Sequence, residues 1–88
     1  MKQWVVYLLF CRDGSLYTGI SSNLSRRLVQ HNKGTASKYT RSRRPVVLVS
    51  AFKVSSRSEA SKFERKIKKL SQSQKLDFFK NEITRRPL

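Results

Sequence analysis

The sequence predicts a small α+β layer structure with its elements in the order β-β-α-β-α-α. Two apolar runs rich in aromatic and β-branched residues, separated by an Asp-Gly turn, indicate a hairpin near the N-terminus. Helix-capping signals followed by apolar residues at helical spacing indicate the helices. The chain has 88 residues, which suits one domain. We expect this domain to span residues 1–82, with a flexible tail at 83–88.

The first two strands are expected at Trp4–Cys11 (WVVYLLFC) and Ser15–Ile20. The first is a continuous apolar run, which is typical of a central strand covered on both faces. A two-residue turn would place Tyr7 and Tyr17 on opposite faces of the sheet. A three-residue turn with Gly14 in the left-handed conformation places them on one face. We favour the three-residue turn because it also aligns apolar residues across the two strands.

The first helix is expected to begin after a cap at Asn23 or Ser22 and to end at a glycine about ten residues later. Residues at four-residue spacing lie on one stripe of a helix, so Asn23, Arg27 and His31 should line up. A basic loop follows, and then VVLVSAF at Val46–Phe52 predicts a third strand.

Two further helices are indicated by capping boxes. The Ser-x-x-Glu box at Ser56 opens a helix with a clear apolar face, and Glu64 falls at the edge of that face. The Ser-x-x-Gln box at Ser71 opens a shorter helix. Beyond Asn81 we expect a loose tail.

The charge of the chain points to a polyanionic partner. Lys and Arg number 20 against 5 acids, a formal net charge of +15, and such a charge repels itself unless an anion such as nucleic acid binds. The longest apolar run is too short to cross a membrane, and the sequence shows no signal peptide or interfacial helix. With Cys11 and one histidine, neither an internal disulfide nor a zinc cluster is expected. These features favour a cytoplasmic protein, and binding to the nucleoid is compatible with them.

Residues 33–44 (KGTASKYTRSRR) are the most basic segment and contain no acid. Lys and Arg side chains in such a loop can contact phosphates, and a tyrosine can stack on an unpaired base. A merely solvated loop is the alternative, but the absence of acids favours phosphate binding. The candidate nucleic-acid-binding residues are Lys33, Lys38, Tyr39, Arg41, Arg43 and Arg44.

In the favoured register, Tyr7 and Tyr17 point to the side on which the first helix packs, where Arg27 and His31 can meet them. Each of these residues also has an ordinary explanation, because strand tyrosines are usually core residues and helix arginines are usually solvated.

Glu64 has two interpretations that the sequence supports about equally. It can form a helix ion pair with Lys68, four residues further on. It can also hold a hard cation such as Mg²⁺ together with waters and a substrate phosphate.

The order and spacing of these residues resemble the GIY-YIG nuclease domain. The motifs are Tyr7 in VVY, YTG at Tyr17–Gly19, the helix NLSRRLVQH and the helical Glu64. VVY stands where GIY is typical and YTG where YIG is typical, and both tyrosines are kept. KYTRSRRP and RSEASKFERKIKKL look like the small stand-alone bacterial branch, the YhbQ-like proteins. The resemblance covers the chain to about residue 80.

The resemblance implies a three-stranded β-sheet flanked by helices. It also implies hydrolysis of a DNA phosphodiester bond with Mg²⁺ (or Mn²⁺) as the cofactor. In the family pattern the helix arginine stabilises the pentacovalent phosphate and the glutamate is the single metal ligand. Carried over, the implied catalytic residues are Tyr7, Tyr17, Arg27, His31 and Glu64, with Gly19 closing the turn.

Two questions stay open on these residues. The base that activates water is either Tyr17, whose phenol is mostly protonated at neutral pH, or His31, whose unperturbed pKa is about 6.5. The expected function is a Mg²⁺-dependent endonuclease in DNA repair, recombination or degradation. We expect it to select branched or single-stranded DNA by structure rather than sequence, with RNA as another substrate. The alternative is a catalytically weak nucleic-acid-binding module.

Overall fold

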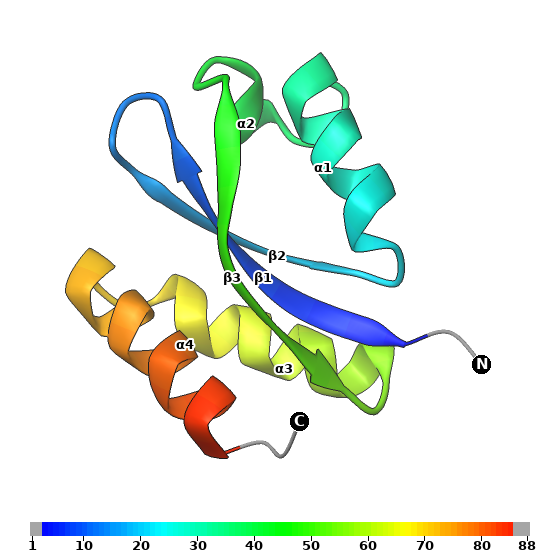
Figure 1. The fold of residues 1–88 in the computed structure, drawn as a ribbon, viewed down its shortest axis with the longest axis vertical. Coiled ribbons are helices and arrows are strands. Elements are labelled where there is room, and N and C mark those ends of the chain that lie inside the picture. Colours follow the sequence, from blue (N-terminus) through cyan, green and yellow to red (C-terminus); the bar gives the residue numbers. More distant parts are fainter. Residues whose placement is uncertain (1–2, 86–88) are drawn as a thin grey trace.

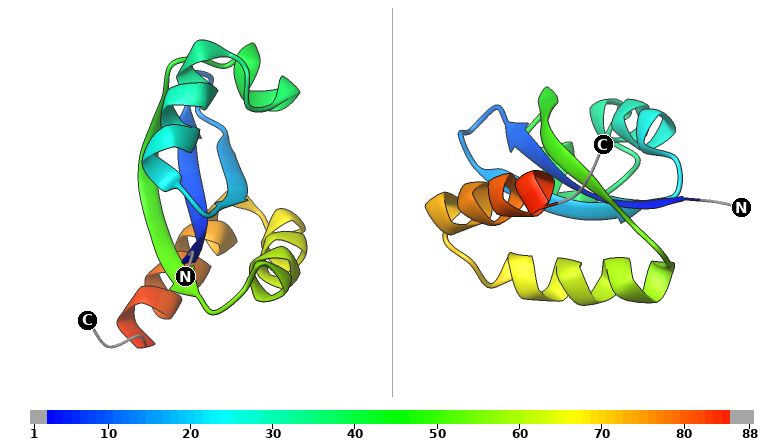
Figure 2. Two further views of the ribbon diagram at one scale, coloured as in Figure 1. Left: turned by 90° about the vertical axis from the view of Figure 1, so that its right-hand side faces the viewer. Right: turned by 60° about the horizontal axis from the view of Figure 1, so that its bottom comes forward.

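The computed structural model describes residues 3–85 and confirms the α+β architecture (Figure 1). The three strands form an antiparallel sheet in the order β2-β1-β3, so the first strand is central as predicted. Helices α1 and α2 cover one face of the sheet, and α3 and α4 cover the other (Figures 1 and 2). The elements are β1 (Trp4–Cys11), β2 (Leu16–Ser21), α1 (Leu24–Lys33), α2 (Lys38–Arg41), β3 (Val46–Val54), α3 (Arg57–Lys68) and α4 (Gln72–Arg85).

The hairpin adopts the register of the three-residue turn. Tyr7 pairs with Gly19 and Leu9 pairs with Tyr17 across β1 and β2. Gly14 has a φ of 85°, the left-handed conformation that this turn needs. Both tyrosines therefore lie on the face that α1 covers.

Alternation along β1 divides the core between the two faces. Val6 and Leu8 pack with Phe52 of β3 against α3 and α4. Tyr7 and Leu9 face α1 instead, in a smaller cluster. The phenol of Tyr7 is thus buried on the face that α1 covers.

The first helix agrees with the sequence, but the basic segment after it does not. The Asn23 side chain accepts a hydrogen bond from the backbone N–H of Arg26, and Gly34 ends α1 with a φ of 83°. Residues 33–44 are not entirely loop, because they contain α2, whose cap is Ser37. The helical turn forms because Thr40 is buried completely against the α1 side of the molecule. Its burial anchors a segment that is otherwise basic and exposed.

Both later capping boxes form. The Ser56 hydroxyl caps α3, and at the start of α4 the Ser71 N–H donates to the Gln74 side chain at 2.9 Å. Helix α4 is longer than expected and continues past Asn81 to Arg85, since the buried Phe79 and Glu82 both lie on it. Residues 86–88, the rest of the expected tail, lie outside the described residues.

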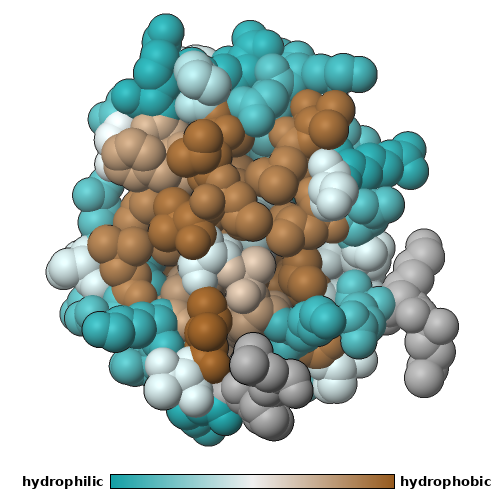
Figure 3. Space-filling model, viewed as in Figure 1, coloured by the Kyte–Doolittle hydropathy of each residue, from teal (hydrophilic) through white to brown (hydrophobic). Residues whose placement is uncertain are grey.

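Apolar side chains gather on the face of the molecule that β3 crosses (Figure 3). Val47, Leu48 and Val49 of this edge strand are all exposed. Phosphates bind cations rather than such a surface, which leaves the opposite edge of the sheet, at β2, as the place for an anionic ligand. No helix within residues 3–85 is long and apolar enough to cross a membrane.

Candidate active site at the β2 edge

Tyr7 reaches the β2 edge by passing over Gly19, its cross-strand neighbour. A β-carbon at position 19 would collide with the phenol ring and hydroxyl of Tyr7. Gly19 therefore lies inside β2 and does not close a turn, contrary to the expectation. It is required there because only glycine leaves room for the buried tyrosine.

The Tyr7 hydroxyl meets His31 of α1, with 2.7 Å between the oxygen and Nε2. The other ring nitrogen, Nδ1, lies 2.8 Å from the hydroxyl oxygen of Thr40 in α2. Thr40 in turn lies 2.9 Å from the Ser37 hydroxyl. This chain of hydrogen bonds links the central strand to both helices on its face.

Burial determines the protonation states of Tyr7 and His31. It raises the pKa of Tyr7 to about 12 and, with a smaller contribution from the charge of Arg27, lowers the pKa of His31 to about 4. At neutral pH the phenol is protonated and the imidazole is uncharged. The phenol then donates to Nε2, which leaves Nδ1–H to donate to Thr40. Thr40 was not among the predicted site residues, because nothing in a basic loop marks a threonine for burial.

Arg27 lies one turn before His31 on α1. Its Nη1 donates to the Gln30 side chain at 3.2 Å. Its Nε is buried and, within the part of the chain that the structure describes, has no hydrogen-bond partner. Arg27 opposes the rise in the pKa of Tyr7 that burial causes, first by a side-chain hydrogen bond to the phenol and then by its charge. A buried cationic N–H without a partner is costly, and the cost is offset when an anion accepts from it.

Tyr17 of β2 completes the cluster from the edge strand. Its ring meets His31 edge to face, with centroids 5.4 Å apart. The hydrogen bonds among residues 3–85 include none to the Tyr17 hydroxyl. Of the two tyrosines, Tyr17 is thus the one with a hydroxyl available to a ligand or water.

Glu64 enters this neighbourhood from α3, which packs against β2. Its carboxylate pairs with Lys68 at 3.3 Å, so the ion pair expected from the sequence forms. The Lys68 ammonium also lies 5.5 Å from the centroid of the Tyr17 ring, and the Glu64 charge is close enough to raise the pKa of Tyr7 slightly. The structure thus brings together all of Tyr7, Tyr17, Arg27, His31 and Glu64, and it adds Lys68 and Thr40.

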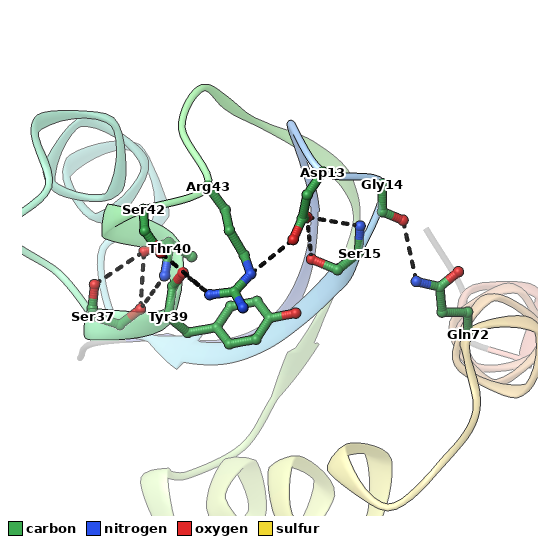
Figure 4. A network of polar contacts seen from close by, with 9 residues as sticks. All are labelled: Asp13, Gly14, Ser15, Ser37, Tyr39, Thr40, Ser42, Arg43 and Gln72. Atoms are coloured by element: carbon green, nitrogen blue, oxygen red, sulfur yellow. Dashed lines mark hydrogen bonds and ion pairs between the residues drawn. The ribbon is translucent and has the colours of Figure 1, made fainter.

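Three of the six predicted nucleic-acid-binding residues have side chains engaged within the protein: Tyr39 and Arg43 (Figure 4), and Arg44, whose Nε donates to the Arg41 carbonyl at 2.8 Å. The Arg43 guanidinium lies 3.8 Å from the centroid of the Tyr39 ring and donates to Asp13 at 2.8 Å. Tyr39 also stacks on Tyr17, with centroids 5.6 Å apart. These contacts join α2 to the β1–β2 turn and to the site. The remaining three lie on α1 or α2: Lys33, Lys38 and Arg41.

The buried His31 makes the stability of the fold depend on pH. Its pKa falls from 6.5 in the unfolded chain to about 4 in the fold, so the unfolded chain binds the extra proton between these values. The free energy of unfolding should be at its full value above pH 6.5 and fall as the pH drops, by about 2 kcal/mol between pH 7 and about pH 4.5. Urea denaturation across this range measures it. Because the chain has one histidine, His31→Gln should flatten the dependence of the unfolding free energy on pH in this range. An unchanged pH dependence in this variant would show that His31 is not the group responsible.

Comparisons with known proteins identify relatives along most of the chain. The GIY-YIG catalytic domain family matches residues 3–77. A UPF0213 protein of Cupriavidus pinatubonensis is 46% identical over 77 residues, which cover 88% of this chain and 86% of the relative. A UPF0213 protein of Staphylococcus haemolyticus is 49% identical over 76 residues, covering 86% and 93% of the two chains. The solution NMR structure of an E. faecalis protein, 39% identical, superposes with a TM-score of 0.69 over all of this chain and 94% of that one.

Proposed function

The chain belongs to the GIY-YIG catalytic domain family, and from this premise we propose that it is a metal-dependent endonuclease that hydrolyses phosphodiester bonds of nucleic acid at the β2 edge. The observation that carries the proposal is the buried Nε of Arg27, a cationic donor without a partner in residues 3–85, beside two tyrosines and a histidine. An oxyanion of a phosphate is the partner that this donor lacks.

The donor groups fit Mg²⁺ or Mn²⁺ held by a single carboxylate. Within residues 3–85 no three His, Cys, Asp or Glu side chains gather into a metal site, so Glu64 is the ligand that the chain offers. Mg²⁺ accepts such a site because it keeps several waters and takes oxygens from substrate phosphates. When bound, the ion would polarise the phosphate and neutralise charge on the leaving oxygen. Lys68 would have to release Glu64 for this to happen.

The chain's own residues divide the remaining work. Arg27 donates to the equatorial phosphate oxygens as negative charge builds on them. Tyr17 is the better candidate for the base, because its hydroxyl is available to water and the Lys68 ammonium lies 5.5 Å from its ring centroid. In this role Tyr17 would act as the phenolate, which is the form that can take a proton from water. His31 is fully buried with both ring nitrogens engaged. We therefore assign His31 to holding Tyr7 and the face of the site in place, rather than to accepting the proton.

A nucleic-acid-binding module without useful catalysis is the second candidate. The ion pair between Glu64 and Lys68 favours it, since it occupies the carboxylate that a metal would need. Cleavage of labelled single-stranded, duplex and branched DNA, with Mg²⁺ and with a chelator, separates the two candidates. Cutting that stops with the chelator supports the nuclease and shows the preferred DNA structure. Tight binding without cutting on every substrate would support the binding module.

Arg27→Lys tests the observation on which the proposal depends. Lysine keeps the charge but lacks the guanidinium fork that reaches two oxygens. We expect single-turnover cleavage to slow by about 10- to 100-fold, with DNA affinity nearly unchanged. The matched control is Arg12→Lys, an exposed arginine after β1, which should cut normally. Equal losses of cutting and affinity in Arg27→Lys would argue that the residue only binds.

A further inference from the structure

Next to the active site the surface opens into a pocket of about 370 Å³. Its lining residues include the first residues of β1 and α3 and residues of α1, and these three elements begin at the same end of the sheet (Figures 1 and 2). Its lining includes Arg26, Arg27 and Arg57 together with Trp4. We propose that this pocket binds one unpaired nucleotide adjoining the cleaved phosphate, with a phosphate held by the arginines and the base stacked on Trp4.

The charge of the pocket is the first support. Three of its lining residues are arginines and none is acidic. None of the three arginines has an acidic partner within the described part of the chain. Like charges held together without a counter-ion repel one another, and an anion relieves this. The first turn of α1 adds to the positive potential, since it starts at the pocket and carries no acid.

The indole of Trp4 is the second support. It is half-buried at the start of the central strand, and the Arg57 guanidinium lies 5.7 Å from its ring centroid. An indole that is partly buried against the core and also lines the pocket offers a stacking surface for a base. Bases inside a duplex have both faces covered by their neighbours. The pocket therefore fits a nucleotide of a single strand or of a frayed end, and its volume suits one nucleotide rather than a duplex segment.

Arg27 connects the pocket to the active site, because it lines the first and belongs to the second. A nucleotide in the pocket would thus be the neighbour of the phosphate that Arg27 contacts. This position next to the cut depends on the proposed nuclease function, whereas binding of a nucleotide in the pocket does not.

Trp4 provides the test, since it is the only tryptophan of the chain. A short thymidine oligonucleotide is titrated into Glu64→Gln protein, so that nothing is cut, and the fluorescence of Trp4 is followed. We expect saturable quenching, with an affinity at least about fivefold above that of an abasic oligomer of equal length. The abasic oligomer should leave the fluorescence unchanged. Equal affinities with no quenching would overturn the proposal.

Arg57→Gln tests the phosphate contact. Removing one phosphate contact to a single strand should lower the slope of log affinity against log salt by about 0.7. Lys80→Gln on α4, which packs on the β3 side, removes the same charge elsewhere and should leave the slope unchanged. Identical slopes in the two variants would contradict the pocket assignment.

Wild-type cleavage separates the two proposals. Quenching by the oligonucleotide without any cleavage would retain the pocket and refute the nuclease. Cleavage without quenching would retain the nuclease and refute the pocket.

Discussion

Glu64→Gln is expected to lower Mg²⁺-dependent cleavage by about 100- to 1,000-fold, because the amide cannot replace a carboxylate as the one protein ligand of the ion. Nucleic-acid affinity should stay the same or rise slightly, since the substitution removes a negative charge from a basic protein. Single-turnover cleavage and equilibrium binding of the same labelled DNA measure the two effects separately.

The matched control is Glu59→Gln on the same helix. Glu59→Gln removes the same negative charge as Glu64→Gln. The Glu59 carboxylate, however, accepts a hydrogen bond from the Ser55 hydroxyl at 2.6 Å, away from the tyrosines. We expect it to retain normal cleavage. If Glu59→Gln lost as much activity as Glu64→Gln, the effect would come from the charge of α3 and not from a metal ligand. If Glu64→Gln cut normally with Mg²⁺, the metal site proposed here would be wrong.

Gly19→Ala is expected to damage both the fold and the site. The added β-carbon collides with the ring and hydroxyl of Tyr7, which is 1% exposed and has no space to retreat into. Overpacking of this kind costs about 1 to 3 kcal/mol, and moving the phenol also breaks its hydrogen bond with His31. We expect a lower free energy of unfolding in urea, and cleavage reduced by at least about 10-fold under conditions where the variant remains folded.

Gly14→Ala separates loss of stability from loss of the site. A β-carbon at Gly14 meets nothing within 4 Å, but the φ of 85° is unfavourable for alanine, so we expect a destabilisation of about 1 to 2 kcal/mol. The turn lies away from Tyr7, and folded Gly14→Ala should cleave DNA like the wild type. Equal activity per folded molecule in Gly19→Ala and Gly14→Ala would show that the position of Tyr7 does not matter for catalysis.

The cluster at the β2 edge uses burial to keep its polar groups in defined protonation states. A phenol with a raised pKa and an imidazole with a lowered pKa both remain uncharged at neutral pH. Two neutral groups can share a short hydrogen bond inside the fold without the cost of burying an ion. The charges of the site, on Arg27 and Glu64, are left to act on the substrate.

Local signals in the sequence were sufficient for the strands, the helix caps and the hairpin register. The caps at Asn23, Ser56 and Ser71 depend on hydrogen bonds between residues three apart, and such bonds form largely regardless of the rest of the fold. The register follows from apolar alternation across one short turn. The family resemblance added the set of site residues, and the structure brings that set together.

Where the sequence was insufficient, the deciding interaction joins segments far apart in the chain. Thr40 became a buried partner of His31, and with it α2 formed, because packing on the α1 side removed the Thr40 side chain from water. Gly19 is required by a side chain of the neighbouring strand, and α4 extends because its later residues are buried.

The sequence by itself therefore determined the three strands and the three longer helices of this protein, and the family resemblance supplied its candidate reactive groups. Tertiary structure decided which of these groups are buried, which donor is left without a partner, and that Trp4 and three arginines line one pocket. The physical reason is that periodicity and capping are properties of neighbouring residues, whereas burial and electrostatic environment depend on every segment that packs around a group.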